Sequence, residues 1–357
     1  MRSASRATTE TARQRPCLLP PHLLERIARN GSAEQRARAL ATLATDAALR
    51  SARLSRQAIH ASQDRVPAPA PSGPRRTICD AGSQERLPGR VRRNEGAPAT
   101  GDAAVDEAYD GLGATYELYR RAYERDSLDE RGLPLLGTVH YGREYDNAFW
   151  DGSQMVFGDG DGDLFTRFTV SVDVIGHELA HGVTENEAEL EYHDEPGALN
   201  ESISDVFGSL VKQHVLQQTA DEADWLIGAG LLTSKVHGVA LRSMRAPGTA
   251  FDDPVLGKDD QPAHLRDYVT TKSDNGGVHT NSGIPNRAFY LAATYLGGFA
   301  WEKAGLIWYA ALRDPKIAPD CGFRSFAGVT ATVAGALFGD AEVKAVTAGW
   351  TEVGVDV

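Results

Sequence analysis

The feature that most constrains this chain is the stretch His177-Glu178-Leu179-Ala180-His181. Helical positions four apart lie on one face, so both imidazoles can reach a single metal ion. Glu178 stands beside the first histidine, where its carboxylate can contact a water molecule at that ion. Apolar residues flank the motif, as a buried helix requires. The motif alone leaves a second interpretation open, in which two histidines are hydrogen-bonded inside a core.

A second predicted helix supplies further groups for a metal site. Glu201 follows His181 by 20 residues, which leaves room for a loop and a returning helix. Catalytic zinc typically takes three protein ligands, and two histidines with a glutamate form one such set. Asp205 lies one turn further on the same face, where it can accept the free ring N–H of a ligand histidine. We therefore expect His177, His181 and Glu201 to bind zinc, although a solvated acidic face is the alternative for Glu201 and Asp205.

A histidine outside this ligand set lies in the segment from Asp274 to Asn286. Two adjacent glycines, Gly276 and Gly277, allow the backbone to bend sharply toward a cleft. Asp274 can pair with His279 and favour its protonated form. A cationic imidazole in a cleft would stabilise an oxyanion, whereas the alternative is a histidine with a purely structural role in a loop.

The order of the predicted elements divides the chain into three parts. Residues 1–75 form a short helical head and a proline-rich linker at 66–74, where few contacts should cross. Residues 76–215 contain strands and both metal-binding helices, and residues 216–357 are mostly helical. Strands before helices indicate an α+β fold of two lobes. We expect antiparallel strands within 135–170 and helices at 102–125, 171–187, 197–218, 222–233, 282–297, 301–312, 322–338 and 340–349.

The head has a composition and helix signals of its own. Residues 1–76 hold 14 Arg and 5 acidic residues, which gives this segment a charge of +9. Because the net charge of the whole chain is −12, residues 77–357 carry −21. The opposite charges favour docking of the head on the body. Binding of nucleic acid by the head is the weaker interpretation, because no aromatic residues lie among its arginines to stack on bases. Proline at the start and Asn30-Gly31 at the end predict one helix, and Ser32 with Gln35 forms a capping box for the next. The apolar side of that second helix consists of Leu40, Leu43, Leu54 and Ile59.

Composition excludes several classes of protein. No stretch approaches the roughly 18 apolar residues of a membrane span. The three cysteines are far apart and form no CxxC pair, which argues against a disulfide scaffold or a thiolate zinc cluster. The basic N-terminus lacks the apolar region of a secretory signal, so we expect synthesis in the cytoplasm and, if the protein is released, another export route.

Taken together, the residues from about Asp102 to the C-terminus resemble the thermolysin family of metallopeptidases. The resemblance implies a two-lobed α+β fold, one catalytic zinc ion, and hydrolysis of proteins or peptides before bulky apolar residues. It implies Glu178 as general base, His279 and Tyr192 as oxyanion donors, and Asp205 as the partner of His177. Further residues implied to bind substrate are Asn147 and Ala148 on an edge strand, Arg242 at the P1′ carbonyl, and Phe165, Phe168, Val174, Ile227 and Leu241 around the S1′ pocket.

The head resembles the short propeptide of the protealysin-like branch through the segment from Cys17 to Leu24. The resemblance implies a zymogen that processes itself and is inhibited by its own propeptide. Three modes of action stay open: Pro20-Pro21 across the cleft without the N–H needed for strand addition, a Cys17 thiolate on zinc, or Cys17 as a small buried packing residue.

One departure from the family concerns calcium. At the five acidic positions of the family's double calcium site, this chain keeps Asp173 and Asp224 but has Lys212, Leu226 and Ala229 at the others. Calcium needs roughly six to eight oxygen ligands, so we expect this double site to be absent, while calcium elsewhere stays open. We expect the Lys212 ammonium to pair with the two aspartates instead.

Three other functions compete with an endopeptidase. One is a secreted toxin with a receptor domain, for which 357 residues leave too little length beside the two lobes. An aminopeptidase with the same zinc motif usually carries an extra acidic motif that binds the substrate's free amine, and none is found upstream. A binding protein with an inactive zinc site has no need for Glu178, Tyr192 and His279 together.

Overall fold

A computed structural model describes residues 17–60 and 73–357 of the chain, and side chains for 17–49 and 73–357. The predictions for residues 1–16, for the linker at 66–72 and for the Leu54 and Ile59 side chains lie outside the described residues. In the described part, no helix is long and apolar enough to cross a membrane.

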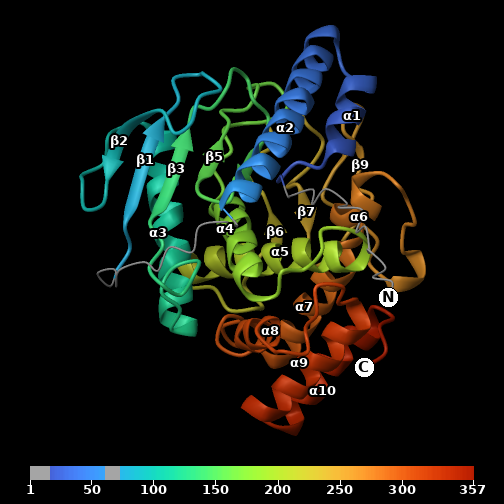
Figure 1. Cartoon of the computed structure of the whole chain (residues 1–357). Helices are drawn as coiled ribbons and strands as arrows, with labels where there is room; N and C mark the ends of the chain where they lie inside the picture. The colour runs from blue at the N-terminus through green and yellow to red at the C-terminus, as the bar shows by residue number, and fades with distance from the viewer. Residues whose placement is uncertain (1–16, 61–72) are drawn as a thin grey trace, which may run out of the picture.

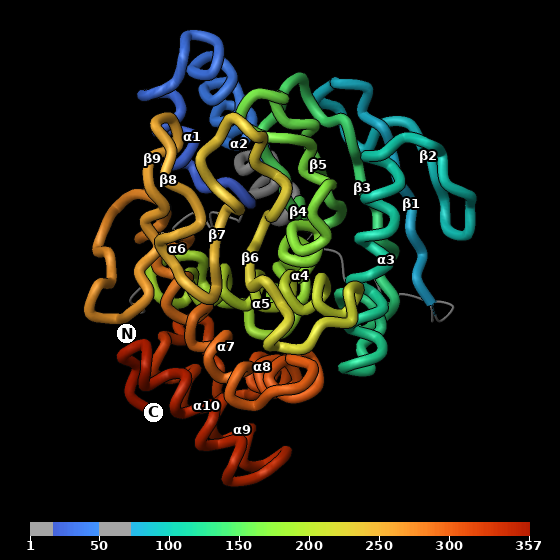
Figure 2. Tube along the Cα trace, turned by 180° about the vertical axis from the view of Figure 1, so that it is seen from behind, coloured from blue at the N-terminus to red at the C-terminus, as the bar shows by residue number. Residues whose placement is uncertain are grey.

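The first lobe is built on a five-stranded sheet with the order β2-β1-β3-β5-β4 (Figure 1, with β4 labelled in Figure 2). β3 is parallel to both β1 and β5, and only the outer pairs β1–β2 and β4–β5 are antiparallel. The prediction of antiparallel strands within 135–170 is therefore confirmed for the β4–β5 pair and wrong for the β3–β5 pair. Parallel neighbours need a crossover, and α3 (Ala103–Tyr123) provides it between β2 and β3. The strands are β1 (Arg76–Asp80), β2 (Arg90–Asn94), β3 (Leu135–Val139), β4 (Ala148–Trp150) and β5 (Met155–Phe157).

Two buried helices form the centre of the molecule. α4 (Val172–Glu187) and α5 (Asp194–Leu216) lie side by side beneath the sheet lobe (Figure 1). Gly208 of α5 permits this close approach, because a Cβ there would lie 2.4 Å from the Asp173 carbonyl oxygen of α4. The predicted helices at 171–187 and 197–218 are confirmed, although α5 begins three residues earlier than predicted.

The second lobe packs against the other side of α5. Its helices are α6 (Asp274–Asn281), α7 (Gly283–Leu296), α8 (Ala304–Leu312), α9 (Phe323–Leu337) and α10 (Asp340–Glu352). The helix predicted at 222–233 is wrong. This segment holds β6 (Leu226–Ile227), paired with β7 (Arg242–Ser243), and then turns through Gly228 and Gly230, whose φ angles are 74° and 86°. The remaining elements are β8 (Asp252–Asp253), β9 (Gly257–Lys258) and the short 3-10 helix η1 (Leu265–Asp267).

The head consists of α1 (Pro21–Asn30) and α2 (Ala33–His60), which cover the upper side of both lobes (Figures 1 and 2). The predicted capping box is present, with Ser32 N donating to Gln35 Oε1 at 2.8 Å and Gln35 N to Ser32 Oγ at 3.2 Å. On the predicted apolar side of α2, Leu43 packs against the apolar core as predicted, whereas Leu40 is 53% exposed. The helix also buries Thr42 and Asp46.

The predicted pairing of Lys212 is confirmed. Its ammonium lies 2.8 Å from both the Asp173 and Asp224 carboxylates and donates to the Leu226 carbonyl at 2.7 Å. Burial opposes the charge, yet the two aspartates raise the pKa of Lys212 above its ordinary value. One cation thus joins α4, α5 and the turn before β6.

We expect Lys212→Met to lower the free energy of unfolding by about 3 kcal/mol, because the fully buried Asp173 loses its counter-charge. Chemical denaturation measures this change. Lys235→Met removes an ammonium that is 67% exposed and should cost less than about 1 kcal/mol. A large saturable rise in the melting temperature of the wild type with calcium would contradict the assignment of Lys212 to the cation position.

Candidate active site

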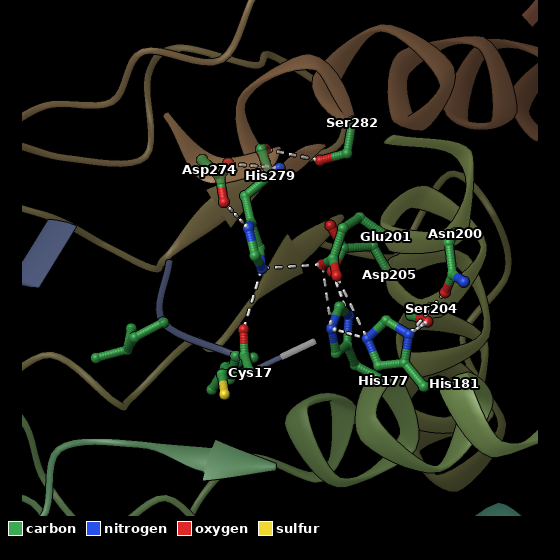
Figure 3. A network of polar contacts seen from close by, with 12 residues as sticks. Cys17, His177, His181, Asn200, Glu201, Ser204, Asp205, Asp274, His279 and Ser282 are labelled. Carbon is green, nitrogen blue, oxygen red and sulfur yellow. Dashed lines mark hydrogen bonds and ion pairs between the residues drawn. The ribbon is translucent and has the colours of Figure 1, made fainter. Parts of the chain in front are cut away.

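Three side chains from α4 and α5 meet at one point in the interior (Figure 3). His177 Nε2 and His181 Nε2 are 3.1 Å apart, and each lies 3.5 Å from a Glu201 oxygen. In the described residues these three form the group able to hold a metal ion, with ligand atoms within 4.8 Å of one another. They are at most 4% exposed.

The surroundings of this group fit a zinc ion. His177 Nδ1 lies 2.8 Å from Asp205 Oδ1, and His181 Nδ1 lies 2.8 Å from Asn200 Oδ1. Each Nδ1 proton therefore has an acceptor, which leaves both Nε2 lone pairs for a shared ion. Burial and the neighbouring His177 lower the pKa of His181, so its imidazole is neutral, as a ligand must be. Glu201 Oε2 is buried and receives no hydrogen bond from any described residue, which leaves it available to a cation.

Glu178 lies beside the ligands and is held by the edge of the sheet. The side chain is fully buried, and its Oε2 accepts a hydrogen bond from the Trp150 backbone N–H at 2.9 Å. β4 therefore positions this carboxylate through a main-chain donor. A fixed carboxylate next to a metal position is suited to move a proton from water.

His279 and Tyr192 converge on the same point from the opposite side (Figure 3 shows His279). The backbone before His279 is left-handed at Asp274, Gly276 and Gly277, with φ of 52°, 86° and 79°. His279 Nδ1 contacts Asp274 Oδ1 at 2.7 Å, and His279 Nε2 lies 3.3 Å from the Tyr192 hydroxyl, which donates to Glu201. Burial lowers the pKa of His279, but Asp274 and Glu201 outweigh burial and raise it to about 9. The imidazole is therefore cationic near neutral pH.

A buried ion pair links the ligands to the second lobe. Arg242 Nε and a terminal nitrogen donate to the two Asp205 oxygens, each at 2.8 Å, and Asn286 Nδ2 also donates to Asp205 at 2.8 Å. Burial would raise the pKa of Asp205, but Arg242 and His177 keep it well below the ordinary value. Asp205 therefore stays ionised and joins His177 to Arg242.

The head enters the site between these groups. Leu18 N donates to the Ala148 carbonyl at 3.1 Å, and Leu19 N donates to Asn147 Oδ1 at 2.9 Å. The Cys17 carbonyl oxygen lies 3.0 Å from His279 Nε2 (Figure 3). The segment with backbone contacts at the site is thus Cys17 to Leu19. Pro20 caps α1 and also lines the small cavity beside Arg242 and His279, so the mode in which the prolines lie across the cleft stays a prediction.

The side chain of Cys17 packs away from the ligand group. Cys17 is 8% exposed and belongs to an apolar cluster with Tyr141, Tyr145 and Phe149. It is not a member of the group of three metal-capable residues. Of the three modes considered from the sequence, this packing favours Cys17 as a small buried residue.

The predicted specificity residues are all buried but do not all line open space. Phe165, Phe168, Val174 and Ile227 are fully buried in the main apolar core. Leu241 and Arg242 line a small cavity together with Leu19, Pro20, Leu23 and His279. The head therefore occupies part of the space beside Arg242.

Several groups at the site were not predicted. Asn200 and Ser204 both contact His181 Nδ1, at 2.8 and 2.9 Å, and helical spacing from Glu201 and Asp205 could have identified them. Asp46 of the head accepts from Asn147 Nδ2 at 3.0 Å and from the Tyr145 hydroxyl. No sequence pattern distinguishes such an aspartate from a solvated one.

Comparisons with known proteins agree with this geometry. Residues 79–185 match the family model of the thermolysin metallopeptidase catalytic domain, and residues 188–355 match that of its alpha-helical domain. An extracellular metalloprotease of Pectobacterium carotovorum subsp. carotovorum is 53% identical over 340 residues, covering 95% of this chain and 96% of that protein. Protease PrtS of a Photorhabdus strain is 50% identical over 344 residues, covering 95% and 92%.

A solved structure shares the whole architecture. The precursor of protealysin, a metalloproteinase from Serratia proteamaculans, is 55% identical and covers 96% of this chain and 100% of its own, with a TM-score of 0.87. The family models, these relatives and the zinc-compatible cluster of His177, His181 and Glu201 lead to one conclusion. The chain belongs to the thermolysin family of zinc metallopeptidases, in its protealysin-like branch.

Proposed function

We propose that this metalloendopeptidase cleaves peptide bonds on the amino side of bulky apolar residues and is made as a zymogen that processes itself. The observation that carries the proposal is the meeting of a fixed carboxylate, a cationic imidazole and three metal-binding side chains around one buried point. In this proposal, residues 1–75 are the propeptide, 76–215 the catalytic lobe and 216–357 the helical lobe. The names of the extracellular relatives support release from the cell.

Each side chain has a distinct role in the proposed reaction. His177, His181 and Glu201 hold zinc, which when bound supplies a Lewis acid that polarises the scissile carbonyl and makes water more acidic. Glu178 takes the proton from the attacking water and delivers it to the leaving nitrogen. His279 and Tyr192 donate to the developing oxyanion. Asp205 and Asp274 are positioning residues, which fix His177 and His279.

Substrate backbone is held by the sheet edge and by Arg242. Ala148 of the outermost strand β4 and Asn147 just before it offer acceptors, so an extended peptide can add to this edge as a further strand. Arg242 keeps a terminal nitrogen directed at the cleft, 3.4 Å from the Leu18 carbonyl. The apolar set Phe165, Phe168, Val174, Ile227 and Leu241 supports a preference for Leu, Phe, Ile or Val after the cut.

Hydrolysis of two matched peptides tests the proposed activity. After an added serine protease has removed the head and been inhibited, the enzyme should cut a blocked Ala-Leu peptide at least about 100-fold faster than its Ala-Asp counterpart. A chelator should remove the activity and zinc should restore it. Equal rates for the two peptides would refute the specificity, and activity that survives metal removal would refute the reaction.

The docked head should be less stable at higher pH because of Asp146. This side chain is 3% exposed, and the charged groups near it are Arg38 from the head and Glu144 and Asp161 from the body. Its backbone N–H donates to Thr42 Oγ1 of α2 at 3.4 Å. Burial and then Asp161 raise the pKa of Asp146 to about 8. The docked form therefore holds a proton that an exposed aspartate loses near pH 4, so docking weakens as pH rises from about 4 to 8, by at most about tenfold per pH unit.

We expect the head to be lost faster at pH 8 than at pH 6, and Asp146→Asn to flatten this dependence because its amide stays neutral. Electrophoresis of the full-length chain over time gives the rates. The exposed Asp267→Asn, in η1, should leave the pH dependence unchanged. An Asp146→Asn chain with the pH profile of the wild type would exclude this role.

A further inference from the structure

We propose that the Cys17–Leu18 peptide bond is the first bond that this enzyme cuts, and that each molecule cuts it in its own chain. The inference rests on the proposed function. It adds a specific bond and an order of events to that function: this cut precedes, and is distinct from, removal of the head.

The backbone after this bond is held as a substrate would be. Leu18 donates its N–H to the Ala148 carbonyl at 3.1 Å, and Leu18 O lies 3.4 Å from Arg242. Leu19 is held by both its backbone groups, since its N–H donates to Asn147 Oδ1 at 2.9 Å and its carbonyl accepts from Asn147 Nδ2 at 3.5 Å. These contacts place Leu18 as the first residue after the scissile bond and Leu19 as the second.

The carbonyl before the bond points at the groups that would act on it. Cys17 O lies 3.0 Å from His279 Nε2, and that nitrogen is 3.5 Å from Glu201 Oε2, which is one of the three ligand groups (Figure 3). A donor aimed at the oxygen of the bond to be cut is what an oxyanion site requires. A peptide bound in the reverse direction would not combine this contact with the bond from Leu18 N to the edge strand.

The two side chains that flank the bond lie in different surroundings. Leu18 is fully buried in the main apolar core, which also contains Phe168 and Leu241. Cys17 packs in the separate cluster with Tyr145 and Phe149. A small residue before the bond and leucine after it therefore both have apolar contacts in the precursor.

Hydrolysis adds one water molecule across the bond. The water oxygen bonds to the Cys17 carbonyl carbon, and the bond to Leu18 N breaks. Glu178 carries one water proton to that nitrogen, and the second water proton also ends there. The products are a carboxylate at Cys17 and a new α-ammonium group at Leu18. The cut does not free the head, because α1 still buries Leu23, Leu24 and Ile27 and pairs Arg26 with Asp260 at 2.6 Å. The cut molecule should therefore stay latent until a later cleavage.

Zinc addition to the metal-free full-length chain starts the test, at two protein concentrations about 100-fold apart. Amine labelling and mass spectrometry should find a new N-terminus at Leu18 before the head is lost, with the same rate constant at both concentrations. Leu18→Phe should keep the cut, whereas Leu18→Asp should slow it at least about 100-fold because a carboxylate would enter the apolar core. Thermal unfolding checks that both variants have a folded body.

A second measurement needs no activity. In the metal-free chain, alkylation of Cys17 by iodoacetamide should be slow in the wild type and in Leu18→Phe, and faster in Leu18→Asp, because Leu18 holds the segment in place.

Three outcomes would overturn the inference, in different ways. If no N-terminus at Leu18 appears while the trimmed enzyme still hydrolyses the Ala-Leu peptide, this inference fails and the proposed function stands. A rate proportional to concentration would overturn cleavage within one molecule. Loss of both reactions would overturn the inference and the proposed function together.

Discussion

Glu178→Gln is expected to lower kcat/KM for peptide hydrolysis by about 10³- to 10⁴-fold while the protein keeps its zinc. The carboxylate of Glu178, the residue after His177, is fully buried and accepts a hydrogen bond from the Trp150 N–H, which holds the side chain in place. Glutamine has nearly the same shape but cannot take a proton from water. The metal ligands His177, His181 and Glu201 are unchanged, which separates proton transfer from metal binding.

Kinetics on the Ala-Leu peptide and metal analysis of the same sample measure the two effects. Glu189→Gln is the matched control, since Glu189 is an exposed residue just after the same helix. It should keep full activity. Turnover within tenfold of the wild type in a zinc-loaded Glu178→Gln enzyme would rule out Glu178 as the general base.

The same variant separates the two ways in which the head could be lost. A Glu178→Gln precursor should retain residues 1–75 during storage if the enzyme is its own maturation protease. Loss of the head at the wild-type rate in this variant would show that another protease removes it. This experiment can therefore refute self-processing without refuting the proposal that the chain is a zymogen.

The metal site could be predicted because zinc chemistry restricts both residue types and spacing. A four-residue separation places His177 and His181 on one face of any helix, and Glu201 and Asp205 repeat that spacing on the next helix. Both pairs meet in the structure, where His177 contacts Asp205 at 2.8 Å. Helical periodicity was sufficient to predict this site, because each of the two helices carries two of its residues at a spacing of four.

The groups that sequence could not reveal act through the backbone or across the fold. Trp150 contributes a main-chain N–H, which every residue except proline has, so no side chain marks it. In the sequence, Asp46 has the features of a solvated residue on a surface helix. Only the fold brings Asn147, which lies 101 residues away, into hydrogen-bond contact with it. The apolar run around Leu226 resembles a helix, but pairing with Arg242 and Ser243 in β7 turns it into a strand. Pairing across distant segments overrides local preference in this case.

Asp205→Asn should weaken zinc binding by about 10- to 100-fold and lower the free energy of unfolding by about 3–5 kcal/mol. The carboxylate is fully buried, and it accepts from His177, Arg242 and Asn286 at once. Asparagine keeps the shape but leaves the buried Arg242 cation without its counter-charge. It also weakens the acceptor that orients His177.

Zinc affinity by competition with a chelator and chemical denaturation of the metal-free protein measure these effects separately. The denaturation experiment isolates the Arg242 pair, because no metal contributes to stability there. Asp221→Asn, an exposed change just beyond α5, is the control and should alter neither quantity. At saturating zinc, the Asp205→Asn enzyme should show a higher KM than the wild type if Arg242 binds substrate as proposed, because Arg242 loses the partner that orients it. A variant with wild-type stability and zinc affinity would mean that Asp205 holds neither His177 nor Arg242 in place. The link between the metal site and Arg242 would then have to run through another residue.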